Sequence, residues 1–290
     1  MEMLHSVFSY LYQFGDAFAF LVLSASGLAV IFGMMGVINL AHGEFILCGA
    51  YVSTSATNMG VPLPLAIAAG SLTAGFAGMI VEFLVIRPLY KRPLDTIVAT
   101  WGISMIVTQG TLIVLGTKMA GSGTPFGSFT VGNYSYSGYR IVLMIMALVT
   151  LAALWLMFTK TRFGILSRAT IQVPHVAEAL RVNTSLIYSL TFGLGAALAG
   201  LAGGLYAPTM TLVPTMGATF MVEAFVTVVV GGADIFLGTA PAAIFLGIIK
   251  TTLTSWQGQL AGQVGMLVAV IIVIRVLPRG ISGKILKERA

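Results

Sequence analysis

Long apolar runs separated by short polar stretches dominate this chain. A helix that crosses a bilayer needs about 20 mostly apolar residues. Nine runs approach or reach that length: Ala17–Val37, Leu40–Met59, Leu63–Ile86, Thr96–Leu115, Ile141–Thr159, Leu186–Tyr206, Phe220–Gly232, Ile235–Ser255 and Val264–Leu277. The second run is interrupted by His42 and Glu44, and the seventh is short. The pattern predicts an all-α polytopic membrane protein with eight or nine transmembrane helices, one of them broken near residues 39–44.

The composition excludes a soluble protein. Hydrophobic residues make up 58% of the 290 positions and charged residues only 8%, whereas soluble domains carry roughly 25% charged residues. Such a chain cannot cover a water-facing surface. We expect one transmembrane domain over residues 1–290.

The net charge of +6 reflects membrane topology and does not indicate nucleic-acid binding. Most basic residues fall into three clusters: Arg87, Lys91 and Arg92; Lys160, Arg162, Arg168 and Arg181; and Arg275, Arg279, Lys284, Lys287 and Arg289. An even number of predicted segments separates each cluster from the next, so all three lie on one side of the membrane. An excess of Lys and Arg marks the cytoplasmic side. Lys118, Arg140 and Lys250 stand apart.

Three polar residues, Asn39, His42 and Glu44, lie between two strongly apolar stretches. Polar groups inside a bilayer are costly and mark functional sites by default. They either form a satisfied network that holds a broken helix, or they line the path of a solute. The sequence leaves both interpretations open.

The longest polar stretch between predicted spans is residues 160–183, which we expect to form a cytoplasmic loop. Pro174 is suited to the first turn of a short helix. That helix would have an apolar face and a charged face, formed by Val176, Ala177 and Leu180 and by Glu178 and Arg181. Such a helix either contacts a soluble partner or rests on the membrane surface.

Other features predict packing and pairing. Gly195, Ala199 and Gly203 recur at four-residue spacing, and so do Ala196, Gly200 and Gly204. Rows of small residues let a neighbouring helix approach closely. Glu223 and Lys250 fall toward the same ends of neighbouring spans, so we expect an ion pair between them. For Glu82, near Arg87, we expect a structural role. Residues 118–139 are rich in Gly, Ser and Tyr and predict an irregular extracytoplasmic cap.

The sequence carries no catalytic signal. It contains no G-x-x-x-x-G-K-[ST] phosphate-binding motif, and three His with one Cys offer no metal cluster of ordinary spacing. We therefore expect no enzyme activity, no metal site and no nucleotide hydrolysis by this chain.

Three stretches resemble the permeases of branched-chain amino acid ABC importers. GLAVIFGMMGVINLAHGEFILCGAYVS (Gly27–Ser53) contains a G-x-x-N-x-A-H-G-E string, Arg168–Ala207 is similar to the coupling region and the helix after it, and Ile274–Lys284 is similar to the closing motif. Ile86–Gln109 and Val222–Gly232 look most like the urea and short-amide branch. Two departures stand out, because Val173 and Pro174 replace a usual polar pair and Arg181 replaces a usual Gly.

The resemblance implies a multi-pass permease subunit in the bacterial inner membrane. Its partners would be a second homologous permease, two cytoplasmic ATPases that use the ATP, and an extracytoplasmic solute-binding protein; the chain itself would hold no cofactor. The solute would be urea or a short amide; alternatives are a branched-chain amino acid importer, or a channel or secondary transporter that works alone. The expected solute-path residues are Asn39, His42, Glu44, Thr100, Trp101 and Glu223. The expected ATPase-coupling residues are Arg168, Pro174, Val176, Ala177, Glu178, Leu180 and Arg181.

Overall fold

A computed structural model describes residues 2–90, 92–132, 134–232, 234, 238–278 and 280–283. Five of the basic residues used to predict topology lie outside the described residues, as does the start of the predicted segment Ile235–Ser255. The five basic residues are Lys91, Arg279, Lys284, Lys287 and Arg289.

The described residues form helices and one β-hairpin, which confirms the all-α class. The α-helices are α1 (Glu2–Met35), α2 (His42–Asn58), α3 (Leu63–Val81), α4 (Pro93–Leu115), α5 (Gly138–Lys160), α6 (Arg162–Gln172), α7 (Pro174–Ala179), α8 (Thr184–Tyr206), α9 (Met216–Gly231), α10 (Ala240–Gln257) and α11 (Gln259–Val276). A π-helical turn, η1 (Glu82–Ile86), and a 3₁₀ turn, η2 (Arg87–Leu89), continue α3, and η3 (Ala207–Thr209) continues α8.

Six helical stretches within the described residues are long and apolar enough to cross a membrane. They are His5–Met35, Leu63–Leu89, Pro93–Leu115, Gly138–Lys160, Thr184–Thr209 and Gln259–Gly283. The predicted second, seventh and eighth segments correspond to α2, α9 and α10, which are shorter or more polar. The count of eight or nine spans is therefore not confirmed.

The break predicted near residues 39–44 lies slightly earlier. Helix α1 ends at Met35, residues 36–41 are not helical, and His42 is the first residue of α2. Gly36 has a φ of +65°, a conformation that glycine adopts without steric cost. Helix α1 also begins at Glu2 instead of Ala17, because the helix continues through Gln13 and Asp16, where the apolar run stops.

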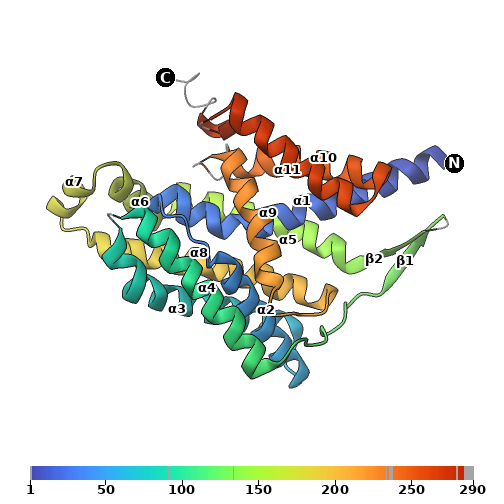
Figure 1. Ribbon diagram of the computed structural model, residues 1–290, viewed down its shortest axis with the longest axis horizontal. Coiled ribbons are helices and arrows are strands. Elements are labelled where there is room, and N and C mark those ends of the chain that lie inside the picture. Colours follow the sequence, from blue (N-terminus) through green and yellow to red (C-terminus); the bar gives the residue numbers. More distant parts are fainter. Residues whose placement is uncertain are drawn as a thin grey trace.

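We expected residues 118–139 to be irregular, but part of this segment is a β-hairpin. It contains the antiparallel strands β1 (Ser128–Val131) and β2 (Tyr134–Ser137). Phe129 pairs with Tyr136 across the hairpin, and both rings contact Phe8 on α1. This aromatic cluster lies at the opposite end of the molecule from α6 and α7 (Figure 1).

Helix α8 packs against α1, α2 and α3 through its glycine rows. A Cβ on Gly203 would lie 1.9 Å from the carbonyl oxygen of Ile46, and one on Gly200 would lie 2.5 Å from the Cβ of Ala74. The rows predicted from four-residue spacing therefore lie at helix contacts, which confirms their packing role.

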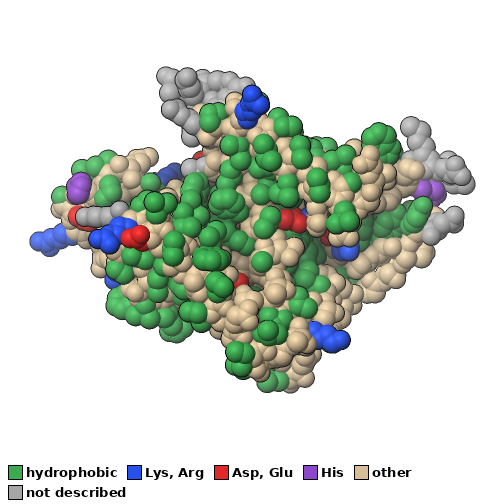
Figure 2. Space-filling model, viewed as in Figure 1, with side chains coloured by type: hydrophobic (Ala, Val, Ile, Leu, Met, Phe, Trp, Pro, Cys, Tyr) green, Lys and Arg blue, Asp and Glu red, His purple; other side chains and the backbone are tan. Residues whose placement is uncertain are grey.

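The outer surface is apolar, as expected for a chain in lipid. Hydrophobic side chains are spread over the visible face, and charged side chains on it are few (Figure 2).

Candidate functional site

Asn39 and His42, two of the predicted path residues, are fully buried. The Asn39 side-chain oxygen accepts a hydrogen bond from the Ala41 amide at 3.0 Å, which closes a local turn. The His42 Nε2 atom lies 3.0 Å from the carbonyl oxygen of Ser24 on α1. Asn39 thus shapes the break, and His42 connects the start of α2 to α1.

Glu44 faces α4 instead. Its Oε1 atom accepts hydrogen bonds from the Ser104 hydroxyl at 2.8 Å and the Thr108 hydroxyl at 3.1 Å. One turn earlier on α4, the Thr100 hydroxyl accepts a hydrogen bond from the Leu40 amide at 3.1 Å. The structure therefore brings Thr100 and Glu44 to one contact between α4 and the start of α2.

Trp101 and Glu223 do not join that contact. Trp101 is 56% exposed on α4. Glu223, on α9, accepts a hydrogen bond from Lys250 on α10 instead, with Oε2 and Nζ 2.6 Å apart. The predicted ion pair is confirmed, and it lies in a separate part of the molecule.

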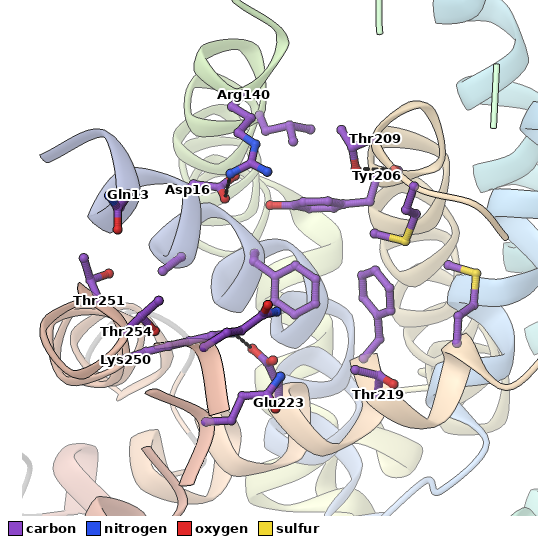
Figure 3. Close-up of a pocket in the computed structure, with 18 of the residues that line it drawn as sticks. Gln13, Asp16, Arg140, Tyr206, Thr209, Thr219, Glu223, Lys250, Thr251 and Thr254 are labelled. Atoms are coloured by element: carbon purple, nitrogen blue, oxygen red, sulfur yellow. Dashed lines mark hydrogen bonds and ion pairs between the residues drawn. The ribbon is translucent and has the colours of Figure 1, made fainter. Parts of the chain in front are cut away.

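The pair of Glu223 and Lys250 lines a cavity of 670 Å³ (Figure 3). The cavity is formed by α1, α5, the end of α8, η3, α9, α10, α11 and the connection between η3 and α9. Its polar lining includes Gln13, Asp16, Arg140, Tyr206, Thr209, Thr215, Thr219, Glu223, Lys250, Thr251, Thr254, Gln259 and Gln263. Its apolar lining includes Phe20, Leu143, Val213, Met216 and Phe220. Asn39, His42 and Glu44 are not among the residues that line it.

Two ion pairs project into this cavity (Figure 3). Asp16 and Arg140 lie 2.8 Å apart and are partly exposed, whereas Glu223 and Lys250 are largely buried. Lys250 also lies 5.2 Å above the ring of Phe20. Asp16 and Arg140 were not among the predicted site residues, although the position of Arg140 outside the basic clusters was a usable signal.

Two buried hydroxyl groups in the cavity wall have no hydrogen-bond partner: those of Tyr206 and Thr251. Tyr206 is 4% exposed, and its ring extends toward Asp16 (Figure 3). A buried polar group without a partner costs about 1–3 kcal/mol. The cavity therefore offers two charge pairs, two free hydroxyls and an aromatic wall to a small molecule.

The described residues contain no group of three or more His, Cys, Asp or Glu side chains that could hold a metal ion.

At the opposite end, residues 160–183 form two helices, α6 and α7, where we expected a loop with one short helix. Pro174 opens α7 as predicted. The expected apolar face is only partly buried, because Ala177 is buried while Val176 and Leu180 are exposed. The remaining predicted coupling residues, Arg168, Glu178 and Arg181, are exposed as well.

Arg181 occupies a backbone conformation that favours glycine. Its φ is +63°, its amide binds the carbonyl of Glu178, and the Val182 amide binds that of Ala177. This is a Schellman motif. The same pattern ends α2, where Gly60 has a φ of +90°. The departure from the family pattern at Arg181 therefore falls where a side chain is strained.

Comparison with known proteins identifies the chain's relatives. The family described as "Branched-chain amino acid transport system / permease component" matches residues 11–277. The probable branched-chain amino acid permease LivH of Methanocaldococcus jannaschii is 27% identical, with 91% of this chain and 88% of that protein covered. LivH of Escherichia coli K12 is 28% identical, with 90% and 91% covered. The autoinducer 2 permease LsrD of Escherichia coli O9:H4 is 30% identical, with 85% and 77% covered. No solved structure matches.

These relatives are named for branched-chain amino acids and autoinducer 2, so the comparisons support the branched-chain alternative better than the urea and short-amide branch. They are transport permease subunits and not enzymes, and their family implies ATPase and binding-protein partners. With the apolar helices, they show a multi-pass inner-membrane protein. The chain belongs to the branched-chain amino acid permease family of ABC importers.

Proposed function

We propose that this chain forms part of the solute path of an ABC importer and that the solute occupies the cavity between the two ion pairs. The chain would act beside a second homologous permease, with two cytoplasmic ATPases that use the ATP and an extracytoplasmic solute-binding protein. The exposed side chains of α6 and α7 are the proposed contact for the ATPases. No cofactor is proposed for the chain itself.

The solute class that fits this cavity best is a zwitterion with an aliphatic side chain, such as a branched-chain amino acid. Arg140 can bind the solute carboxylate, and Glu223 can bind its ammonium group. Phe20, Leu143 and Phe220 supply an apolar wall for the side chain. The observation that carries the proposal is the presence of an acid–base pair on each side of one cavity.

A zwitterion can enter the cavity without leaving an unpaired charge, whereas a singly charged solute cannot. Leaving one partner of a buried ion pair without its counter-charge costs about 3–5 kcal/mol. A solute that brings both charges can place its carboxylate beside Arg140 and its ammonium group beside Glu223 while Asp16 and Lys250 keep their present contacts, so every charge has a counter-charge. The free hydroxyls of Tyr206 and Thr251 can donate further hydrogen bonds to the solute.

Urea or a short amide is the second candidate, because residues 86–109 and 222–232 resemble that branch. An uncharged amide would leave both ion pairs intact and bind the hydroxyls of Tyr206 and Thr251. The two candidates therefore differ in whether the charges of the cavity are needed for transport.

Uptake by the reconstituted importer, with its ATPase and binding-protein partners, tests both candidates. We expect ATP-dependent uptake of L-leucine and little uptake of urea or acetamide. The double variant Asp16→Asn/Arg140→Gln removes one pair without leaving an unpaired charge, and it should lower leucine uptake at least about 30-fold. Lys118→Gln, an exposed cation outside the cavity, is the matched control.

Two results would reject the zwitterion. One is uptake of urea or acetamide but not leucine; the other is leucine uptake that the double variant leaves unchanged. Uptake by this chain alone without ATP would reject the importer itself and favour a channel or secondary transporter.

A further inference from the structure

Glu82, at the end of α3, has a carboxylate that is fully buried and surrounded by donors. The hydroxyls of Tyr90 and Ser189 both donate to it. The Arg87 guanidinium contacts both carboxylate oxygens at 3.4 Å and donates to the Ser189 hydroxyl at 2.8 Å. Burial and the neighbouring Glu82 raise the pKa of Tyr90, so Tyr90 remains a donor.

The local backbone explains why Glu82 and Arg87 meet. Residues 82–86 form a π-helical turn, and the Arg87 amide binds the Glu82 carbonyl. Five-residue spacing in such a turn puts Glu82 and Arg87 on one face. π-Helical turns are rare and occur frequently at functional sites. The turn is therefore a second feature, besides the buried charge, that sets this end of α3 apart.

The donors come from segments on either side of Glu82. Tyr90 lies just before α4, and Ser189 lies in the second turn of α8. The rings of Tyr90 and Tyr188 are also in contact, 5.3 Å apart. Glu82 is thus the point where the end of α3, the approach to α4 and the start of α8 meet.

The start of α8 is in turn bound to α7. Thr184, the first residue of α8, donates a hydrogen bond to Glu178 of α7 at 3.0 Å, and only residues 180–183 separate the two helices. A displacement of α7 would therefore move the first turns of α8, and with them Ser189.

We infer that Glu82 is a positioning residue that couples movement of α7 and the start of α8 to α3 and α4. This inference rests on the proposed contact of the ATPases with α6 and α7. A buried carboxylate cannot lose one donor without its remaining partners rearranging. Withdrawal of Ser189 would therefore shift Arg87 and Tyr90, which determine how α3 ends and α4 begins. Because Arg87 donates to both Glu82 and Ser189, the network has alternative partners available, as coupling between distant sites requires.

If Glu82 had a purely structural role, we would expect a different result. In that case, loss of one donor would lower thermal stability without changing how the cavity responds to nucleotide. The test therefore needs a readout at the cavity, on the other side of the molecule from α7.

Cysteine labelling supplies that readout without requiring a known solute. Cys48 is the only cysteine of this chain, so a Cys48→Ala background removes its native thiol, and the same complex without an introduced cysteine gives the background labelling of the partners. Thr219→Cys then places one thiol in the cavity lining. The complex with its ATPase and permease partners is labelled with a charged methanethiosulfonate, with and without trapped MgATP and vanadate.

In the parent protein, we expect nucleotide trapping to change the labelling rate at least about five-fold. Ser189→Ala removes only the α8 donor, and it should abolish this change. Ser189→Thr keeps a hydroxyl and should restore it. Ser185→Ala, the same substitution one turn earlier on α8 at a side chain with no hydrogen bond to Glu82, is the matched control and should behave like the parent. Tyr90→Phe should reproduce the effect of Ser189→Ala.

The outcomes separate the two claims. Nucleotide-dependent labelling that persists in both Ser189→Ala and Tyr90→Phe overturns the role of Glu82 and leaves the proposed function intact. Labelling that does not respond to nucleotide even in the parent protein overturns the proposed function, and the inference fails with it.

Discussion

Helices α8 and α4 are alike in length and apolar character, but they are attached to the molecule in different ways. In the most apolar 18-residue stretch of each, 56% of the α8 residues are buried and only 6% of the α4 residues. Helix α8 packs against α1, α2 and α3, whereas α4 contacts mainly α2 and η2. One is a core helix, and the other lies at the margin of the bundle.

Their contacts differ in chemistry as well. The packing of α8 depends on glycines, because the lack of a Cβ lets the backbone of α8 approach its neighbours closely. Helix α4 depends on a row of hydroxyls, Thr100, Ser104 and Thr108, at four-residue spacing. This row binds the Leu40 amide and the Glu44 carboxylate. Of the polar side chains near the break, Glu44 therefore serves as an attachment of α4, whatever further role it has in transport.

Adding volume to α8 should have the largest effect. Gly203→Val places a Cβ 1.9 Å from the Ile46 carbonyl oxygen, a backbone atom that cannot turn away. Overpacking of this kind costs about 3 kcal/mol or more, so we expect little folded protein. Yield and thermal midpoint in detergent are the measurements. Gly110→Val on α4, where a Cβ meets nothing within 4 Å, is the control. Equal losses in the two variants would contradict the contrast between the helices.

Removing the Glu44 carboxylate, which accepts hydrogen bonds from α4, should have a smaller and more local effect. Glu44→Leu leaves the hydroxyls of Ser104 and Thr108 without their carboxylate, a loss of about 2 kcal/mol. Hydrogen exchange should accelerate along α4 and remain unchanged in α8. Glu44→Gln keeps a carbonyl oxygen for both hydroxyls and should retain most of the protection. If Gln and Leu accelerated exchange equally, the hydroxyl row would not be what holds α4.

The helices themselves were predictable because apolar runs are long and continuous. The run Leu63–Ile86 matches α3 with η1 in both bounds, and Thr96–Leu115 matches the end of α4. Gln13 and Asp16 interrupt the apolar run but not the helix, so the first fifteen residues of α1 were missed. Apolar periodicity also could not show the hairpin, whose strands are stabilised by contacts of Phe129 and Tyr136 with α1.

The polar sites were predictable only in part, because pairing depends on tertiary contacts. The pair of Glu223 and Lys250 could be proposed from two charges at matching ends of neighbouring segments. Asp16 and Arg140 are 124 positions apart, and no local pattern joins them. Glu223 and Asn39 were predicted to share one solute path, and no local pattern could show that Glu223 lines the cavity whereas Asn39 does not.

Thr100→Val should give the smallest effect of the three, about 1 kcal/mol. The substitution keeps the shape of the side chain and removes the oxygen that accepts from the Leu40 amide. Exchange of that amide should accelerate, while α4 stays attached through Glu44. Thr111→Val, on the same helix at a side chain without a hydrogen bond to α2, should leave both the thermal midpoint and the Leu40 amide unchanged. Acceleration along the whole of α4 would instead show that Thr100, and not Glu44, makes the larger contribution to holding α4 against the start of α2.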